Sequence, residues 1–354
     1  MPGPPLTPTR RSWRVVVVVV VVLALVGGGV LIVSRSRHRS SSESASSEMS
    51  GPALSPPTGV TTTRPPVITD YVEPDRPSAV GVTVMSFTDL TRTTPARGSR
   101  EALTTRPLTV VVRYPTVGMP GDDELVDAPP YESAPLVLFA HGYDISTERY
   151  RALLHDIAAA GFVVAAPEFP MSSTVYDGAP DEYDIPEQAR DLSFLITAMS
   201  SPDSPTVRSG MVEPGPVAVM GHSDGAVTAL LAGYAPRYCD SRIAAVVAVS
   251  GDFDTFGGAW FTTSDPPLLA IHGEYDEINP FDSSVTLVDN DPGEAMLVGV
   301  MGASHLGAVT DPASEPSVAL LIAYDLRWRL GDSAEARSMT YAVASTPPLE
   351  LISG

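Results

Sequence analysis

The stretch Val217–Gly233, which reads VAVMGHSDGAVTALLAG, decides how the rest of the chain is interpreted. An apolar run ends at Met220, Ser223 stands between Gly221 and Gly225, and an alanine-rich helical pattern follows at once. Glycines on both sides of a serine permit a strained turn in which β-carbons would clash. Between a buried strand and a helix, this turn is a nucleophile elbow, which raises the serine hydroxyl above the edge of a sheet. The alternative is an ordinary turn in which Ser223 only caps the helix.

Short apolar runs alternate with helical patterns from residue 80 to residue 330. Strands are expected at 80–87, 108–115, 136–142, 162–167, 216–221, 243–251, 266–273 and 295–302. Such alternation predicts an α/β fold, in which a mostly parallel central sheet of about eight strands has helices on both faces. In sheets of this kind the active site lies beyond the carboxyl ends of the strands.

A nucleophilic serine needs a base, and the base needs an orienting acid. Two histidines follow Ser223, of which His272 lies inside an apolar strand pattern and is expected to be packed there. His305 follows the last predicted strand in a glycine-rich loop and is the expected base. Asp276, after the preceding strand, is the expected acid. Neighbouring carboxylates stay open as alternatives: Glu274, Glu277, Asp252 and Asp254.

Two backbone N–H groups are expected to form the oxyanion hole. One belongs to Asp224, directly after the serine, and the other to Tyr143, in the loop that follows the strand at 136–142. The Asp224 carboxylate would oppose negative charge at that place, although it suits the first turn of a helix. Aromatic and apolar residues of two loops could form the pocket wall or simply be core: Phe169, Met171, Tyr176, Phe253, Phe256, Trp260 and Phe261.

The 354-residue chain has a net charge of −20, and its basic and acidic residues are unevenly distributed. Residues 1–40 hold six arginines and no acidic residue. Three of these arginines lie within residues 1–14, which are therefore interpreted as a basic tail in front of a targeting segment. The 19 uncharged residues 15–33 would span about 28 Å as a helix, which predicts a transmembrane signal anchor. A cleaved signal peptide, and hence a secreted protein, is the alternative.

The remainder of the chain is divided by composition. Residues 34–79 are rich in Ser, Thr and Pro and predict a disordered linker. Residues 80–335 are expected to form the catalytic domain and 336–354 a C-terminal tail. The acidic body argues against nucleic acid as a partner. The single cysteine, Cys239, excludes an intramolecular disulfide and a multi-cysteine metal site. No dinucleotide-binding or P-loop glycine motif follows any predicted strand.

Six segments together resemble the α/β-hydrolase superfamily: FAHGYDISTERY, GFVVAAPEF, QARDLSFLI, GHSDGA, HGEYDEINP and GASHLG. More narrowly, the chain resembles the branch of dienelactone hydrolases, chlorophyllases, platelet-activating-factor acetylhydrolase-like proteins and cutinase-like polyester hydrolases. The resemblance covers roughly residues 80–330 and implies ester hydrolysis through an acyl-enzyme, without metal or cofactor. Two features depart from it: Asp224 replaces the commoner uncharged residue, and the paired cysteines of some secreted relatives are absent.

The expected protein is a serine ester hydrolase held at the cell membrane by one N-terminal helix. Its catalytic domain is expected to be monomeric, to lie outside the cytoplasm, and to act on a small-molecule or lipid ester. Two alternatives use the same fold: an acyltransferase with the same three residues, and a binding protein that has lost turnover.

Overall fold

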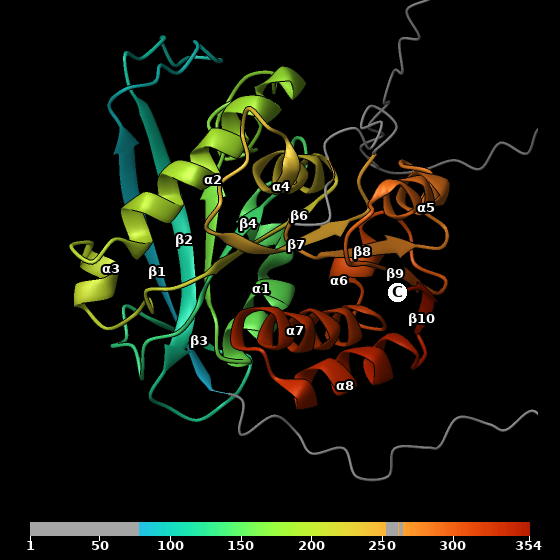
Figure 1. The fold of residues 1–354 in the computed structure, drawn as a ribbon. Helices are drawn as coiled ribbons and strands as arrows, with labels where there is room; N and C mark the ends of the chain where they lie inside the picture. The colour runs from blue at the N-terminus through green and yellow to red at the C-terminus, as the bar shows by residue number, and fades with distance from the viewer. Residues whose placement is uncertain (1–77, 253–260, 262–264) are drawn as a thin grey trace, which may run out of the picture. The chain divides into compact units, whose positions relative to one another are not determined.

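The computed structural model describes residues 78–252, 261 and 265–354 (Figure 1). The predicted basic tail, the predicted membrane segment 15–33 and nearly all of the linker therefore lie outside the described residues. In the part that is described, no helix has both the length and the apolar character needed to cross a membrane.

Ten strands of the described residues form one mixed sheet in the order β10-β9-β8-β7-β6-β4-β5-β2-β1-β3. The strands are β1 (Ala79–Asp89), β2 (Arg106–Thr116), β3 (Glu124–Val126), β4 (Leu136–Ala140), β5 (Val163–Glu168), β6 (Val217–His222), β7 (Ile243–Val249), β8 (Leu268–Gly273), β9 (Ala295–Val300) and β10 (Leu349–Ser353). From β5 to β9 across the sheet, every neighbouring pair is parallel. The pairs β1–β2, β2–β5 and β9–β10 are antiparallel.

All eight predicted strands are present, so the α/β class with a mostly parallel sheet is confirmed, and two further strands lie at the edges of the sheet. β3, which pairs with β1, has only three residues and is too short to show a hydrophobic period in the sequence. β10 lies in the segment 336–354, for which a tail was expected. That expectation is wrong, because the segment holds most of helix α8 (Ala334–Ala344) and a strand that covers the open edge of β9.

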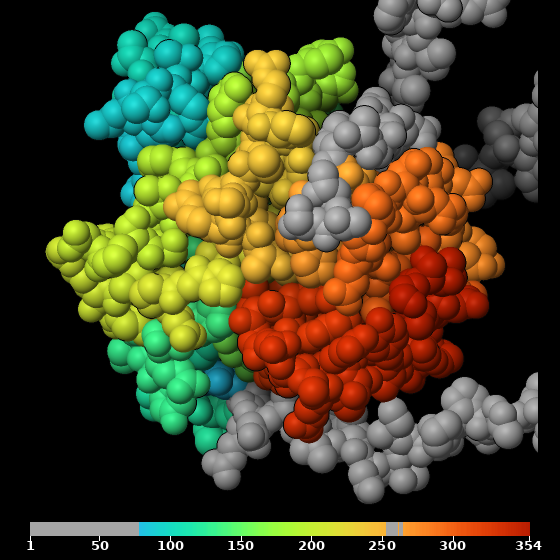
Figure 2. Space-filling model, in the orientation of Figure 1, coloured from blue at the N-terminus to red at the C-terminus, as the bar shows by residue number. Residues whose placement is uncertain are grey.

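Helices pack on both faces of the sheet (Figure 1). They are η1 (Thr147–Tyr150), α1 (Arg151–Ala159), η2 (Glu182–Asp184), α2 (Ile185–Ser200), α3 (Pro205–Arg208), α4 (Asp224–Tyr234), α5 (Phe281–Asn290), α6 (Gly307–Thr310), α7 (Glu315–Gly331) and α8. One buried cluster joins the sheet to α2 and α4, and a second joins the other face to α1, α7 and α8. In the space-filling view α7 and α8 form one continuous surface (Figure 2).

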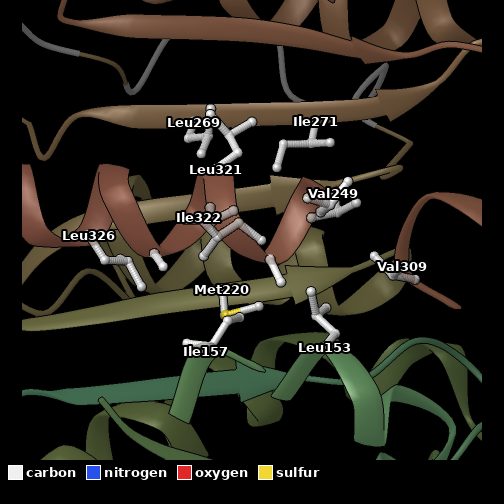
Figure 3. Close-up of a cluster of buried hydrophobic side chains, with 14 of the residues drawn as sticks. Leu153, Ile157, Met220, Val249, Leu269, Ile271, Val309, Leu321, Ile322 and Leu326 are labelled. Atoms are coloured by element: carbon white, nitrogen blue, oxygen red, sulfur yellow. The ribbon is translucent and has the colours of Figure 1, made fainter. Parts of the chain in front are cut away.

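The central strands are buried on both faces, as their nearly continuous apolar sequences predict. In the second cluster Met220 of β6 lies near Leu153 and Ile157 of α1, while Leu321 of α7 lies beside Leu269 of β8 (Figure 3). Every residue of β4, β6 and β8 is buried. Side chains that serve chemistry must therefore come from the strand ends and the loops that follow them.

Candidate active site

Ser223 lies in a strained turn at the carboxyl end of β6. Its backbone has φ 57° and ψ −126°, and α4 begins at the next residue. A β-carbon on Gly221 would lie 2.0 Å from the carbonyl oxygen of Gly225. A β-carbon on Gly225 would lie 2.0 Å from the carbonyl oxygen of Ala140 on β4. The two glycines are therefore steric requirements of the turn, which is the geometry of a nucleophile elbow.

His305 and Asp276 come together from loops at the carboxyl ends of β9 and β8. His305 Nδ1 lies 2.8 Å from Asp276 Oδ2, and the Asp276 side chain is fully buried. Asp276 Oδ1 accepts the backbone N–H groups of Ile278 and Asn279, at 2.9 and 2.8 Å. Although burial alone would raise the pKa of Asp276, these hydrogen bonds and those of His272 and His305 lower it well below its usual value.

The ionised state of Asp276 sets the tautomer of His305. A carboxylate without a proton is only an acceptor, so Nδ1 of His305 must carry the hydrogen. Nε2 is then the nitrogen that can accept a proton. His272 stays in its strand, as predicted, yet it also contributes, because its Nε2 lies 3.2 Å from Asp276 Oδ2 and its Nδ1 lies 2.7 Å from Ser284 Oγ.

The alternative carboxylates are engaged elsewhere. Glu277 Oε2 accepts the backbone N–H of His305 at 3.1 Å, and Glu274 Oε2 accepts the backbone N–H of Gly302. Asp252 Oδ1 lies 3.3 Å from the hydroxyl of Ser283. Asp254 lies outside the described residues. Among the described candidates, Asp276 is thus the carboxylate that bonds to the His305 ring.

A cavity of about 190 Å³ brings Ser223 and His305 together. Its lining is completed by Gly142, Tyr143, Asp144, Ile145, Tyr150, His222 and Leu306. Asp276 is absent from this lining and lies behind His305. The Tyr143 side chain is 42% exposed, which leaves it accessible to a molecule entering the cavity.

The two N–H groups expected in the oxyanion hole belong to Tyr143, which lines the cavity with Ser223, and to Asp224, which directly follows Ser223. Within the described ranges, neither the N–H of Tyr143 nor that of Asp224 donates to another protein atom. By contrast, the neighbouring N–H of Gly142 is occupied, since it donates to the Tyr150 hydroxyl at 3.1 Å. The Asp224 N–H also belongs to the first turn of α4, where helical N–H groups have no intrahelical acceptor.

His222 and Tyr150 form a hydrogen-bonded chain that sequence reasoning missed. The Tyr150 hydroxyl lies 2.9 Å from His222 Nδ1, and His222 Nε2 lies 3.0 Å from the carbonyl oxygen of His305. From the sequence alone, Tyr150 fits the apolar face of a helix, and His222 stands at the end of an apolar strand. The available signal was a histidine beside the serine, on a strand that is otherwise apolar.

His141 binds the carbonyl oxygen of Gly142, whose N–H is bound by Tyr150. Its Nδ1 lies 2.8 Å from the Gly142 carbonyl oxygen, and its Nε2 accepts the backbone N–H of Phe169 at 3.1 Å. His141 is fully buried, and that burial lowers its pKa, so the ring is neutral. The Gly142 carbonyl belongs to the same peptide unit as the Tyr143 N–H, and the two point in opposite directions across a trans peptide. His141 therefore orients the Tyr143 N–H.

The predicted pocket wall is not assembled as expected. Phe169 is fully buried and packs against the His141 ring, with ring centroids 4.9 Å apart, and Met171 is also buried. Neither lines the cavity beside Ser223. Phe261 is core and packs on Tyr234. Phe253, Phe256 and Trp260 lie outside the described residues, and Tyr176 stacks under Arg100. A side chain's apolar type does not reveal whether it faces a core or a cavity.

The Asp224 carboxyl is largely buried beside the site. Burial raises its pKa to about 6, and the nearby carboxylates of Glu182 and Asp252 add to the effect, whereas His305 opposes it. An ordinary aspartate has a pKa of 3.8. The folded protein therefore binds this proton more tightly than the unfolded chain does.

Asp224→Asn is expected to stabilise the protein in a pH-dependent manner. The folded state loses stability as the pH rises from about 4 through 6, because Asp224 must ionise in a buried place. At pH 7.5 the variant should gain on the order of 2 kcal/mol in the free energy of unfolding, and at pH 4 almost nothing. Urea unfolding of both proteins at the two pH values measures this. A gain of equal size at both would contradict the assignment.

Comparison with known proteins agrees with an α/β-hydrolase fold. Residues 111–273 match the Chlorophyllase family. A solved structure of a ferulic acid esterase from Streptomyces cinnamoneus is similar, with a TM-score of 0.60 and 17% sequence identity, over 80% of this chain and 98% of that chain. At this identity the likeness shows the fold. The search of curated proteins found no match.

Proposed function

We propose that this chain hydrolyses carboxylic esters through a serine acyl-enzyme, because it has an α/β-hydrolase fold and is similar to the Chlorophyllase family over residues 111–273. The observation that carries the proposal is the juxtaposition of three side chains. Ser223 in its strained turn and His305 line one cavity, and His305 Nδ1 is bonded to the buried Asp276 carboxylate. Serine, histidine and aspartate also follow one another in the chain order typical of α/β hydrolases.

The geometry supports the following sequence of steps. Ser223 Oγ attacks the ester carbonyl carbon while its proton passes to His305 Nε2. Asp276 stabilises the resulting imidazolium, and the N–H groups of Tyr143 and Asp224 bind the oxyanion. The alcohol leaves with the proton from His305, and the acyl group stays on Ser223. Water then attacks the acyl-enzyme with His305 again as base, which releases the acid and restores the serine.

Turnover of a graded set of esters tests this function. Full-length protein in detergent would be given p-nitrophenyl esters of increasing acyl length, together with a feruloyl ester because of the structural neighbour. Hydrolysis that saturates with substrate is expected. If the acyl group passes mainly to an added alcohol and hardly to water, the protein is an acyltransferase. If a fluorophosphonate, which labels activated serines, does not react and no ester is cleaved, the protein is a binding protein.

We further propose that residues 15–33 hold the enzyme in the cell membrane with residues 40–354 outside the cytoplasm. The support is in the sequence: residues 15–33 are an uncharged run of membrane length, and a Ser/Thr/Pro-rich segment separates them from the folded domain. Three arginines stand on each side of the run, at 10, 11 and 14 and at 35, 37 and 39, so the orientation rests on the Ser/Thr/Pro-rich segment, which suits the outer side of a membrane. In this arrangement the acidic body would be translocated behind a signal anchor.

Protease added to intact cells or spheroplasts should release a soluble, active domain. Cleavage is expected between about Ser40 and Ala79, where a Ser/Thr/Pro-rich backbone offers unprotected peptide bonds. Ester turnover in the supernatant and the N-terminal sequence of the released fragment measure this. A domain that is cut only after permeabilisation has the opposite orientation. A mature N-terminus beyond Val33, found without added protease, would show a cleaved signal peptide and a secreted enzyme.

A further inference from the structure

We propose that Tyr150 and His222 are positioning residues. They fix the loop that carries Gly142 and Tyr143 relative to the loop that carries His305, with Ser223 between the two. The proposal rests on the function proposed above and names how its site is kept in register. Three consecutive hydrogen bonds carry it: Gly142 N–H to Tyr150 at 3.1 Å, Tyr150 to His222 at 2.9 Å, and His222 to the His305 carbonyl at 3.0 Å. Tyr150 and His222 are at most 1% exposed, so water does not compete for these bonds.

The direction of every proton in this chain follows from chemistry. The His305 carbonyl oxygen is only an acceptor, so His222 Nε2 must carry the hydrogen. Burial, together with the proximity of His305, lowers the pKa of His222 to about 3, so the ring is neutral and its Nδ1 is an acceptor. The Tyr150 hydroxyl therefore donates to His222, and its oxygen accepts the Gly142 N–H. No other placement of the hydrogens gives hydrogen bonds to all four groups, which are the Gly142 N–H, the Tyr150 hydroxyl, the His222 ring and the His305 carbonyl.

Each end of the chain reaches a group that the proposed reaction uses. At one end Gly142 precedes Tyr143, whose N–H is the proposed oxyanion donor. His141 holds the Gly142 carbonyl, so both backbone groups of this glycine are bound. At the other end the carbonyl of His305 is anchored by His222, while its ring is anchored by Asp276. His222 itself immediately precedes Ser223, so all three reacting groups are tied to one buried pair of side chains.

Loss of the Tyr150 hydroxyl should slow chemistry and leave binding nearly unchanged. Tyr150→Phe preserves the edge contact of the ring with Phe139 and removes only the oxygen. The Gly142 N–H then loses its acceptor, and His222 Nδ1 loses its donor. Displacement of reacting groups by about 1 Å costs on the order of 10²-fold in rate. We expect kcat to fall roughly 10- to 10²-fold, with KM within about twofold.

Tyr234→Phe is the matched control. Tyr234 is also buried, and its hydroxyl donates to the Pro266 carbonyl at 2.9 Å, outside the cavity at Ser223. Both variants lose one buried hydroxyl group, which makes two hydrogen bonds in Tyr150 and one in Tyr234, so both should unfold at lower urea concentration. The value of kcat should fall in Tyr150→Phe and stay at the wild-type level in Tyr234→Phe. Equal kcat in the two variants would overturn the proposal.

Two substitutions of His222 provide a test that does not depend on Tyr150. The amide nitrogen of glutamine reaches about as far as imidazole Nε2, so His222→Gln can still donate to the His305 carbonyl, whereas His222→Asn is too short. His222→Gln should therefore retain several-fold more kcat than His222→Asn. Equal losses would show that the donor to His305 is irrelevant.

A double-variant measurement completes the experiment. Since either change breaks the same chain, Tyr150→Phe combined with His222→Asn should lose about as much kcat as the worse single variant. A loss equal to the product of the two would mean independent effects and would contradict a single chain. Wild-type protein that fails to hydrolyse any ester would overturn the proposed function and this inference with it. Wild-type turnover with an unaffected Tyr150→Phe variant would overturn the inference alone.

Discussion

Ser223→Ala should reduce ester hydrolysis by a factor of order 10⁶, to near the rate in buffer. The substitution removes the attacking oxygen, and groups that act as one unit lose nearly all rate when one is missing. Alanine keeps a β-carbon and no more, so the strained turn at φ 57° and the packing of α4 should persist. Initial rates on the best p-nitrophenyl ester, with circular dichroism as a check of folding, measure the effect.

Ser250→Ala is the matched control for this experiment. Ser250 also follows a central strand, β7, and also has a positive φ of 49°, but its side chain is fully buried. It lies outside the lining of the cavity, so its hydroxyl cannot meet an ester there. Wild-type rates are expected for this variant. If purified Ser223→Ala keeps substantial turnover, another group attacks the ester.

Asp276→Asn should lower turnover by about 10⁴-fold, the size of the effect in serine proteases. The asparagine amide can donate to His305 Nδ1, which favours the imidazole with hydrogen on Nε2 instead of Nδ1. That tautomer cannot accept the serine proton. Since Asp276 receives hydrogen bonds from two histidines and two backbone N–H groups, the variant should also be less stable, which unfolding curves will show.

Glu277→Gln separates the two carboxylates of this loop. Glu277 accepts the backbone N–H of His305, whereas Asp276 bonds to the ring, and a glutamine oxygen can accept the same backbone bond as Glu277. Its effect on kcat should be small. If Glu277→Gln or Asp252→Asn abolishes turnover and Asp276→Asn is mild, the acid has been assigned wrongly.

The fold could be predicted because its signals are local and strong. Eight apolar runs of strand length separated by helical patterns are each visible in a few consecutive residues. The turn at Ser223 was visible because two glycines are needed where β-carbons would meet backbone at 2.0 Å. The strand β10 was not, because an edge strand of five residues with one buried side chain has no clear period.

The supporting residues of the site could not be predicted, because their roles depend on contacts between distant segments. His222 bonds to a carbonyl 83 residues later in the chain, and Tyr150 to a ring 72 residues later. In the sequence both fit a buried strand or helix face equally well. For Phe169 the sequence left a place in the pocket wall and a place in the core equally open. In the structure the ring packs in the core against His141.

The most direct test of the account is to trap the acyl-enzyme. Wild-type protein mixed with excess p-nitrophenyl ester would be quenched in acid during turnover and analysed by intact and peptide mass spectrometry. We expect one acyl group, on the peptide that contains Ser223, together with a burst of p-nitrophenol equal to the enzyme concentration if deacylation is the slower step. Rapid ester turnover with the acyl group on any other residue would contradict it.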